Sequence, residues 1–292
     1  VEFADIEKDS YNICPEKIEE KLKNDSSIKA IIPVHIAGNI CNMEKICAIA
    51  KKYEVYVIED SAHAFPAKSK DGWAGTFGDV GVFSFYATKT ITTAEGGMVV
   101  TSNEELAKRM TTMRLHGIDR PVWDRYTSKK ASWEYDVIDA GFKFNMPDIL
   151  AAIGIEQLKK ADIFLEQRKK IVEKYNKEFS KYDYFILPPD SDGNAWHLYL
   201  LGLNLSKLSI TRNEFAQFLQ DRGIGISMHF IPHYKFSIFK HRTDFNEINF
   251  PNAEEHFQRT ISLPLWPGMT DEMIKIVTDN VIELGIKYGK GN

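Results

Sequence analysis

The chain of 292 residues is poor in cysteine and has no strong excess of charge of either sign. Its three cysteines, Cys14, Cys41 and Cys47, form neither a Cys-x-x-Cys pair nor a disulfide framework. We therefore expect three free thiols and a reducing, cytoplasmic compartment. The formal net charge is −4, and lysine and arginine are scattered, which excludes the basic footprint of a nucleic-acid-binding protein.

The sequence also lacks the patterns typical of several other classes of protein. No apolar stretch reaches the length of a membrane span, and the first residues lack a signal-peptide pattern, so we expect no membrane partner. The glycines at positions 75, 78 and 81 do not have the dinucleotide-binding spacing, and no Walker-type loop occurs, which disfavours a nicotinamide enzyme. His229 and His233 have no third ligand at a matching spacing, so no metal site is predicted.

Alternating apolar and amphipathic segments dominate the first part of the chain. They predict a helix at 15–22, a strand at 30–34, a helix through 43–50, and strands at 55–58 and 80–86, the last of them buried. Strand–helix–strand alternation is typical of a parallel sheet covered by helices. In such α/β folds, ligands bind outside the carboxyl ends of the strands.

The second part of the chain predicts a different organisation. Residues 116–145 are polar, aromatic and aperiodic, and they predict a long functional loop. Beyond it we expect helices at 148–158, 166–179 and 211–221, a strand at 198–203, an extended segment at 225–230, and a final helix from residue 271. The proline-rich and polar stretch at 187–194 marks the best boundary. We therefore predict a large domain over 1–186 and a smaller α+β domain over 187–292.

Lys89 and Asp60 each follow a predicted strand. A lysine just after a strand is usually a solvated charge, but Lys89 is followed closely by Glu95-Gly-Gly97. Such a lysine can form a Schiff base with pyridoxal phosphate when burial lowers its pKa, and glycines let the backbone approach the cofactor. An aspartate in the position of Asp60 would keep the pyridine nitrogen protonated. The alternative for Asp60 alone is a helix cap.

The remaining polar candidates depend on these two residues. His63 would face the cofactor ring, and Ser84 would hold a phosphate oxygen, although its hydroxyl could instead bond the neighbouring backbone. Asn145 lies where the long loop becomes a helix, and on its own it is more typical of a helix cap.

Ten segments, taken together, resemble the DegT/DnrJ/EryC1/StrS family of sugar-nucleotide aminotransferases. The segments are Pro33-Val-His-Ile-Ala-Gly38, Glu59-Asp-Ser-Ala-His-Ala64, Phe83-Ser-Phe-Tyr-Ala-Thr-Lys89, Ala94-Glu-Gly-Gly97, Arg114-Leu-His-Gly117, Gly141-Phe-Lys-Phe-Asn-Met-Pro-Asp148, Ala195-Trp-His-Leu198, Gly223-Ile-Gly225, His229-Phe230 and Leu263-Pro-Leu-Trp-Pro267. They occur in order over essentially the whole chain. The branch that makes UDP-4-amino-4-deoxy-L-arabinose looks most similar, partly because His63 stands where several other branches have glutamine.

The resemblance implies the fold type I architecture of pyridoxal-phosphate transferases and a homodimer with active sites at the interface. It makes Lys89 the Schiff-base lysine and Asp60 the partner of the pyridine nitrogen, with His63 flanking the ring and Ser84 on the phosphate. It also implies that Asn145 reaches the partner subunit's phosphate. His197 and His229 fall in regions that usually line the sugar-nucleotide pocket.

The implied reaction is transfer of an amino group from glutamate to a keto, most simply 4-keto, nucleotide sugar used for cell-surface polysaccharide or lipopolysaccharide. One rival within the family is a sugar dehydratase that uses pyridoxal or pyridoxamine phosphate; its members typically have histidine in place of the lysine, so Lys89 argues against it. A rival from another class is a non-catalytic chain, a truncated paralogue that only pairs with a full-length partner.

Family members carry a further segment before the point at which this chain begins. That segment normally supplies a phosphate-binding loop and an aromatic side chain that stacks on the cofactor ring. The resemblance therefore implies an incomplete large domain, weak cofactor binding and little activity for residues 1–292 alone.

Overall fold

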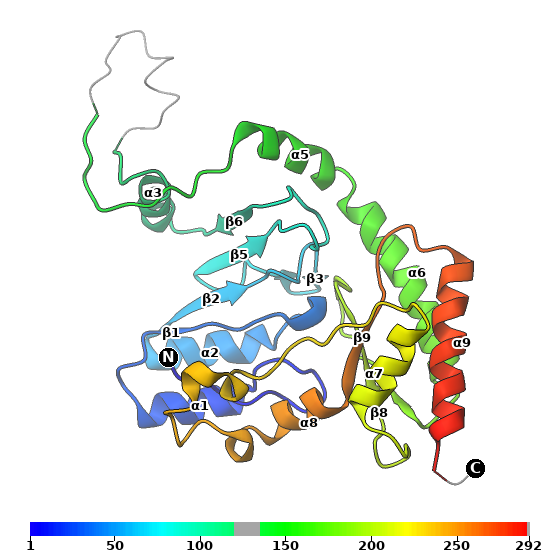
Figure 1. The fold of residues 1–292 in the computed structure, drawn as a ribbon. Helices are drawn as coiled ribbons and strands as arrows, with labels where there is room; N and C mark the ends of the chain where they lie inside the picture. The colour runs from blue at the N-terminus through cyan, green and yellow to red at the C-terminus, as the bar shows by residue number, and fades with distance from the viewer. Residues whose placement is uncertain (120–134, 291–292) are drawn as a thin grey trace.

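The structure of the chain is a computed structural model that describes residues 1–119 and 135–290. Its main elements form two units on separate sheets, and helix α6 runs from the first into the second (Figure 1). The first unit contains α1 (Pro15–Asn24), β1 (Ala30–Ile31), η1 (Ile36–Gly38), α2 (Met43–Tyr53), β2 (Tyr56–Asp60), β3 (Lys68–Ser69), β4 (Gly72–Trp73), β5 (Val80–Ser84), β6 (Gly97–Val100), α3 (Glu104–Met113) and α5 (Asp148–Leu158). The second contains α6 (Ala161–Phe179), β7 (Phe185–Ile186), β8 (Tyr199–Leu203), α7 (Arg212–Asp221), η2 (His233–Lys235), η3 (Ser237–Phe239), η4 (Glu247–Asn249), α8 (Pro251–Arg259), β9 (Thr260–Leu263) and α9 (Asp271–Tyr288).

The first sheet has the strand order β1–β2–β5–β6. β1 pairs in parallel with β2 and β2 in parallel with β5, whereas β6 is antiparallel to β5. The predicted α/β fold with a mainly parallel sheet is therefore confirmed. The strand predicted at 30–34 is shorter than expected: β1 ends at Ile31, and a single bridge joins Val34 to Asp60 beyond Pro33, which has no N–H to donate to the ladder.

Helices α1 and α2 pack together against one face of this sheet (Figure 1). Side chains alternate across a strand, so Val57 joins the core beneath α2 while Tyr56 and Asp60 belong to the other face. On that other face Val82 and Val99 are exposed. The strand predicted at 80–86 is present as β5, but the prediction that it is buried is wrong, because the described residues leave this face of β5 partly open.

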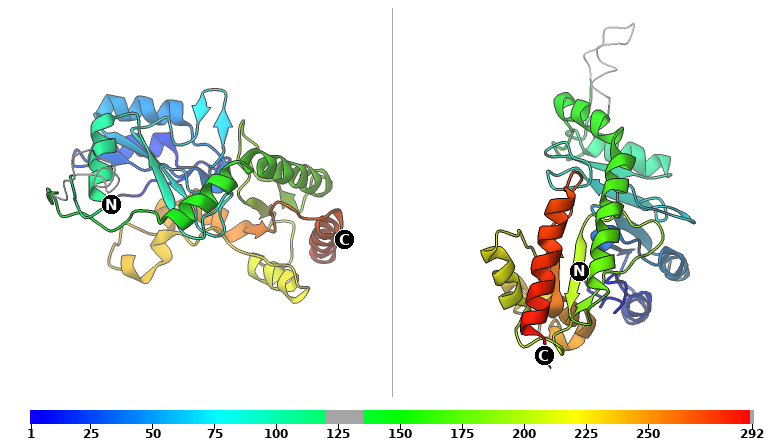
Figure 2. Two further views of the ribbon diagram at one scale, coloured as in Figure 1. Left: turned by 90° about the horizontal axis from the view of Figure 1, so that it is seen from above. Right: turned by 90° about the vertical axis from the view of Figure 1, so that its right-hand side faces the viewer.

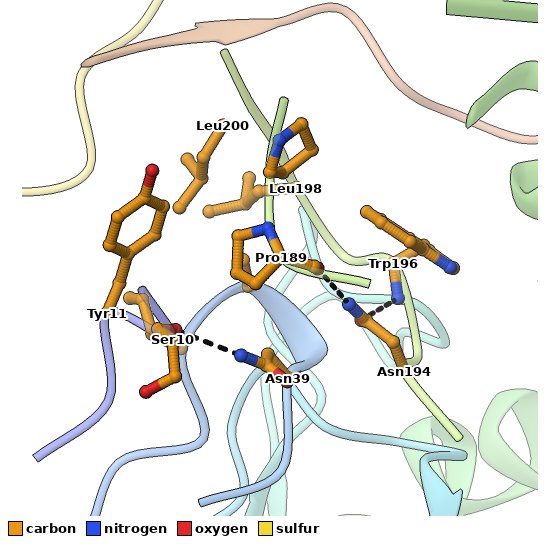
Figure 3. Close-up of a pocket in the computed structure, with 11 residues that line it drawn as sticks. Ser10, Tyr11, Asn39, Pro189, Asn194, Trp196, Leu198 and Leu200 are labelled. Atoms are coloured by element: carbon orange, nitrogen blue, oxygen red, sulfur yellow. Dashed lines mark hydrogen bonds between the residues drawn. The ribbon is translucent and has the colours of Figure 1, made fainter. Parts of the chain in front are cut away.

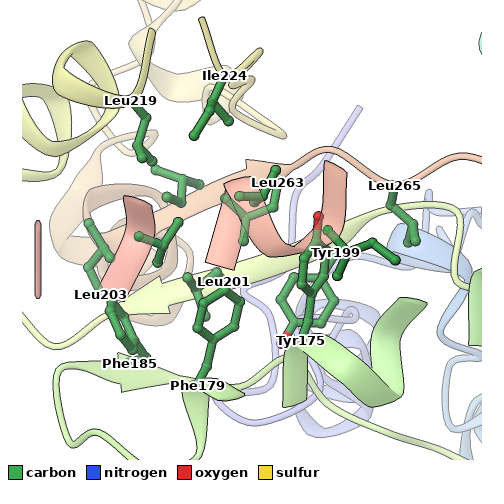
Figure 4. Close-up of a cluster of buried hydrophobic side chains, with 14 of the residues drawn as sticks. Tyr175, Phe179, Phe185, Tyr199, Leu201, Leu203, Leu219, Ile224, Leu263 and Leu265 are labelled. Carbon is green, nitrogen blue, oxygen red and sulfur yellow. The ribbon is translucent and has the colours of Figure 1, made fainter. Parts of the chain in front are cut away.

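The second unit has its own core around the antiparallel sheet β7–β8–β9. All five residues of β8 are buried, and helices α6, α7 and α9 contribute side chains to the same cluster (Figure 4). Figure 2 shows α6 and α9 lying side by side along this unit. Because α6 ends before residue 186, part of the core lies on the amino-terminal side of the boundary placed between 186 and 187; the division into domains stays a prediction.

Several elements differ from the expectation. Strand β6 and helices α3 and α8 were not predicted, and α6 begins at Ala161 rather than at residue 166. Of the loop predicted at 116–145, residues 120–134 lie outside the described residues. Bridges between Leu115 and Lys143 and between Ile118 and Val137 join the described flanks of this loop. No helix in the described ranges is both long and apolar enough to span a membrane.

Candidate functional site

Asp60 and Lys89 lie at and just beyond the carboxyl ends of neighbouring parallel strands. Asp60 is the last residue of β2 and pairs in register with Val82 of β5. Lys89 follows β5 after a short turn, in which its backbone N–H donates to the carbonyl of Tyr86 (2.9 Å). The predicted juxtaposition of these two residues at one edge of the sheet is therefore present.

The Lys89 ammonium group is partly buried. Burial lowers the pKa of Lys89, and the nearby negative charge of Asp60 raises it only in part. Lys89 in turn lowers the pKa of His63, His197 and His229 by charge repulsion, so its amino group lies within electrostatic reach of all three rings. Four other predicted site residues, Asp60 and these three histidines, are thus electrostatically coupled to the Lys89 amine.

His63 and His197 come from different units and meet at the seam between them. Their ring centroids are 4.4 Å apart. The N–H of Ala37 donates to Nδ1 of His63 (3.3 Å), and the carbonyl of Ala37 accepts from the N–H of His197 (2.8 Å). One residue of the first unit, Ala37, therefore positions both histidines, and its N–H leaves the proton of neutral His63 on Nε2.

The backbone at this seam adopts left-handed conformations that side chains rarely favour. Ala37 has a φ of 58° and Trp196 a φ of 49°. Gly38, with a φ of 101°, has no room for a side chain, because a Cβ there would lie 2.8 Å from the nitrogen of Trp196. Figure 3 shows the small apolar pocket beside this crossing, with Asn194 bonded to the backbone of Trp196. Close backbone packing at Gly38 and Trp196 therefore determines how the two units are positioned relative to each other.

Both seam histidines are neutral over the physiological range. Burial lowers the pKa of His63 to about 3 and that of His197 to about 2, and Lys89 and the neighbouring histidine rings add to the effect. Behind His197, the buried guanidinium of Arg168 donates to the carbonyls of Trp196, His197 and Leu265 at 3.2, 3.1 and 2.9 Å. No described acid forms an ion pair with Arg168, so it adds positive charge to this region.

His229 approaches the same region from the second unit. Its Nδ1 lies 2.7 Å from the hydroxyl of Ser262 in β9. The backbone of His229 bonds the ring of His256, which packs against Tyr11 with centroids 4.0 Å apart. Two polar side chains therefore hold His229, and sequence periodicity gave no sign of either contact.

Ser84 and Asn145 are placed less directly. The hydroxyl of Ser84 accepts a hydrogen bond from the N–H of Tyr86 (3.3 Å), which is the alternative that the sequence left open for it. Asn145 accepts a hydrogen bond from Lys143 and does not cap α5, whose first flanking residue is Pro147. The helix-cap interpretation of Asn145 is therefore wrong, and the cofactor roles of both residues remain predictions.

Sequence reasoning missed a buried pair next to Asp60. Glu59 and His35 are fully buried, and Nε2 of His35 lies 2.9 Å from the Glu59 carboxylate. Burial acts to raise the pKa of Glu59, but hydrogen bonds from His35, Gly78 and Gly75 outweigh it and lower that pKa. A charged residue at the end of an apolar run was the one signal available.

Comparison with known proteins identifies the fold and the family. The model of the DegT/DnrJ/EryC1/StrS aminotransferase family matches residues 1–282. The spore coat polysaccharide biosynthesis protein SpsC of Bacillus subtilis is 40% identical over 284 residues, which are 96% of this chain and 71% of that protein. A UDP-4-amino-4,6-dideoxy-N-acetyl-beta-L-altrosamine transaminase of Campylobacter jejuni is 36% identical over 294 residues, covering 100% of this chain and 75% of the transaminase.

A solved structure gives the same result. PseC of Helicobacter pylori, an aminotransferase involved in the biosynthesis of pseudoaminic acid, superposes with a TM-score of 0.89 at 28% sequence identity. The match covers 98% of this chain and 74% of PseC. The predicted fold type I architecture is therefore confirmed, while the assignment to the 4-amino-4-deoxy-arabinose branch stays a prediction.

The described residues fit the cofactor of this family. DegT-type aminotransferases depend on pyridoxal phosphate, and solved structures of the same fold include PLP and PMP forms. Here a partly buried lysine of lowered pKa stands near an aspartate. Two buried polar atoms of the site, Oγ of Ser61 and Nδ1 of His197, have no hydrogen-bond partner within the described part of the chain. No cluster of described residues suits a metal ion.

The two neutral histidines predict a loss of stability in mild acid. A histidine with an ordinary pKa near 6.5 in the unfolded chain takes up a proton below that pH, whereas folded His197 stays neutral to about pH 2. The unfolded state therefore binds more protons, and stability falls as the pH decreases from 6.5. Replacing His197 by Asn should reduce the fall between pH 6.5 and 5 by about 2 kcal/mol, measured by urea unfolding. The exposed His241→Asn variant is the control, and equal pH slopes for His197→Asn and the parent would contradict the assignment.

Proposed function

The chain belongs to the DegT/DnrJ/EryC1/StrS aminotransferase family, and we propose that it transfers an amino group from glutamate to a keto group of a nucleotide-linked sugar. The proposal rests chiefly on one observation: Lys89, with a pKa lowered by burial, stands beside Asp60 at the ends of adjacent strands. The amino sugar formed would serve polysaccharide biosynthesis, the process for which SpsC is named.

Lys89 is suited to carry the reacting proton. Its lowered pKa increases the fraction of free amine at neutral pH, and only the free amine can attack a carbonyl or accept a proton. Asp60 would hold a proton on the ring nitrogen of pyridoxal phosphate, which when bound supplies an electron sink for the substrate carbon. His63, whose Nδ1 already accepts from Ala37, presents its Nε2–H as a donor beside Lys89.

The sugar nucleotide would approach along the second unit. His197 and His229 are held there by backbone and by Ser262, and both rings are neutral donors or acceptors at physiological pH. Phe230 stacks at 5.8 Å from the ring of His63 and is exposed, so it extends an aromatic surface from the site. Hydroxyl groups of a sugar and the negative charge of a nucleotide diphosphate both suit this lining, with Arg168 behind it.

A second copy of the chain would complete the site. Helix α5 is apolar, yet none of its residues is buried, and Phe142 and Phe144 before it are exposed and stacked. The helix packs on the turn that follows Lys89, where the N–H of Thr92 donates to the side chain of Gln157 (3.4 Å). Continuity between this apolar surface and the lysine turn supports a homodimer with shared active sites. Asn145 directly follows Phe144 in the chain.

The assignment of Lys89 predicts a specific covalent label. The protein loaded with pyridoxal phosphate is reduced with borohydride and analysed by peptide mapping. The pyridoxyl group should be found on Lys89. The Lys89→Ala variant should lose the label and, because both nucleophile and proton carrier are removed, at least about a thousandfold in turnover. Labelling of the exposed Lys70 instead would remove the central assignment.

A panel of acceptors tests the substrate class. With glutamate as donor, 4-keto nucleotide sugars should yield amino sugars, whereas 3-keto isomers of the same nucleotides should yield less product by mass spectrometry. Release of ammonia without a new amino sugar would instead support a dehydratase. Absence of both products from a protein labelled at Lys89 would favour the non-catalytic alternative.

The shared site predicts complementation between two inactive chains. Lys89→Ala and Asn145→Ala variants, mixed under conditions that exchange subunits, should regenerate one intact site in each mixed dimer, with Lys89 from the Asn145→Ala chain and Asn145 from the Lys89→Ala chain. Random pairing places half of the chains in mixed dimers, so activity should recover to a fraction of the parent value. Mixed dimers demonstrated by mass spectrometry but without recovered activity would count against a shared site.

A further inference from the structure

Glu59 lies next to Asp60 but on the opposite face of β2. Alternation along the strand sends the Asp60 side chain to the open face and the Glu59 side chain into the interior. A buried carboxylate is retained only when hydrogen bonds compensate for its lost hydration. The family motif accounts for the aspartate and gives no role for the glutamate.

The Glu59 carboxylate accepts four hydrogen bonds. Oε1 accepts from the N–H of Phe77 and of Gly78, both at 2.7 Å, and Oε2 accepts from the N–H of Gly75 at 2.8 Å. The fourth donor is Nε2–H of His35 at 2.9 Å. These bonds connect the loop at 75–78 to the end of β2, the strand whose last residue is Asp60.

His35 connects the same carboxylate to the Asp60 backbone. Its Nδ1 accepts from the N–H of Cys41 (3.1 Å), which fixes the proton on Nε2 facing Glu59. Its backbone N–H donates to the carbonyl of Asp60 (3.1 Å). By contrast, the Asp60 carboxylate itself accepts one hydrogen bond within the described part of the chain, from the N–H of Ala62 (3.0 Å). The direction of that carboxylate therefore depends largely on how its backbone is held.

We propose that Glu59 and His35 are positioning residues that fix the end of β2 and so aim the Asp60 carboxylate at the ring nitrogen of the cofactor. This inference rests on the proposed function, because it takes Asp60 as the partner of that nitrogen. Neither residue touches the reacting atoms. Their effect reaches the cofactor through Asp60, and it goes beyond simple stabilisation of the fold.

The spectrum of the bound cofactor distinguishes positioning from a purely structural role. Asp60 keeps the ring nitrogen protonated, and that positive charge lowers the pKa of the nitrogen that links Lys89 to the cofactor. A misaimed Asp60 should therefore raise the pKa of this linkage, followed as a change in visible absorbance with pH. Loss of stability alone would reduce the amount of loaded protein and leave this pKa unchanged.

The test compares four variants of the protein with the reference variant Asp60→Asn. Glu59→Gln removes the charge and places an amide against backbone donors, and His35→Leu removes the fourth hydrogen bond; each should raise the linkage pKa by about 0.5 or more. His35→Gln retains a donor toward Glu59 and should shift it less than His35→Leu. Glu44→Gln, on the exposed side of α2, should leave it within about 0.2 of the parent.

Asp60→Asn is the reference for complete loss of the interaction between Asp60 and the ring nitrogen. It should raise the linkage pKa at least as much as Glu59→Gln or His35→Leu does. If Asp60→Asn raises the linkage pKa while folded, loaded Glu59→Gln and His35→Leu do not, the positioning role is overturned and the proposed function stands. If Glu59→Gln does not fold, the comparison of His35→Leu with His35→Gln decides whether the positioning role stands. If Asp60→Asn itself leaves the linkage pKa unchanged, the assignment of Asp60 in the proposed function is overturned, and this inference with it.

Discussion

The site depends on the hydrogen bonds that join the backbone at residues 37–38 to the backbone at residues 195–198. Through them the carbonyl of Ala37 accepts from His197, and the carbonyl of Gly38 accepts from Ala195 (3.0 Å). The two units have separate cores, so this seam determines where the second unit's histidines stand relative to Lys89. Residues with left-handed backbone on both sides make the contact sterically demanding and therefore specific in its geometry.

Burial at this seam governs the chemistry around Lys89. A protonated amine is costly in a poorly solvated place, and the histidines around it are neutral for the same reason. Asp60 opposes the effect in part, and the pKa of Lys89 stays below that of an ordinary lysine. This balance between burial and a nearby carboxylate is consistent with the roles of nucleophile and proton carrier that we propose for Lys89.

Local sequence pattern predicted the positions of Lys89 and Asp60 because a strand end fixes where the next side chain lies. It also predicted the parallel sheet and most helices of the second unit. It could not predict the contact between His63 and His197, which depends on a long-range backbone crossing at Ala37 and Trp196. Family resemblance named both histidines but not their contact.

Glu59 shows a second limit of sequence reasoning. Its partners at 75–78 are backbone N–H groups, which every residue except proline carries, so no residue type marks them in the sequence. The same holds for the exposed faces of β5 and α5. Apolar residues there predict burial, and the structure shows instead which of those faces the described chain leaves open.

Arg168 has a consequence for how the site receives a ligand. Among the described residues around the two seam histidines, Lys89 and Arg168 carry positive charge and Asp60 carries negative charge. An anion that binds beside Lys89 therefore makes its proton harder to lose, and by thermodynamic reciprocity the protonated amine binds that anion more tightly than the free amine does. Ligand capture and activation of the nucleophile thus compete for the same proton. The competition is weaker for an anion that binds nearer to Arg168. Burial lowers the pKa of this guanidinium only to about 10, so it remains charged at neutral pH.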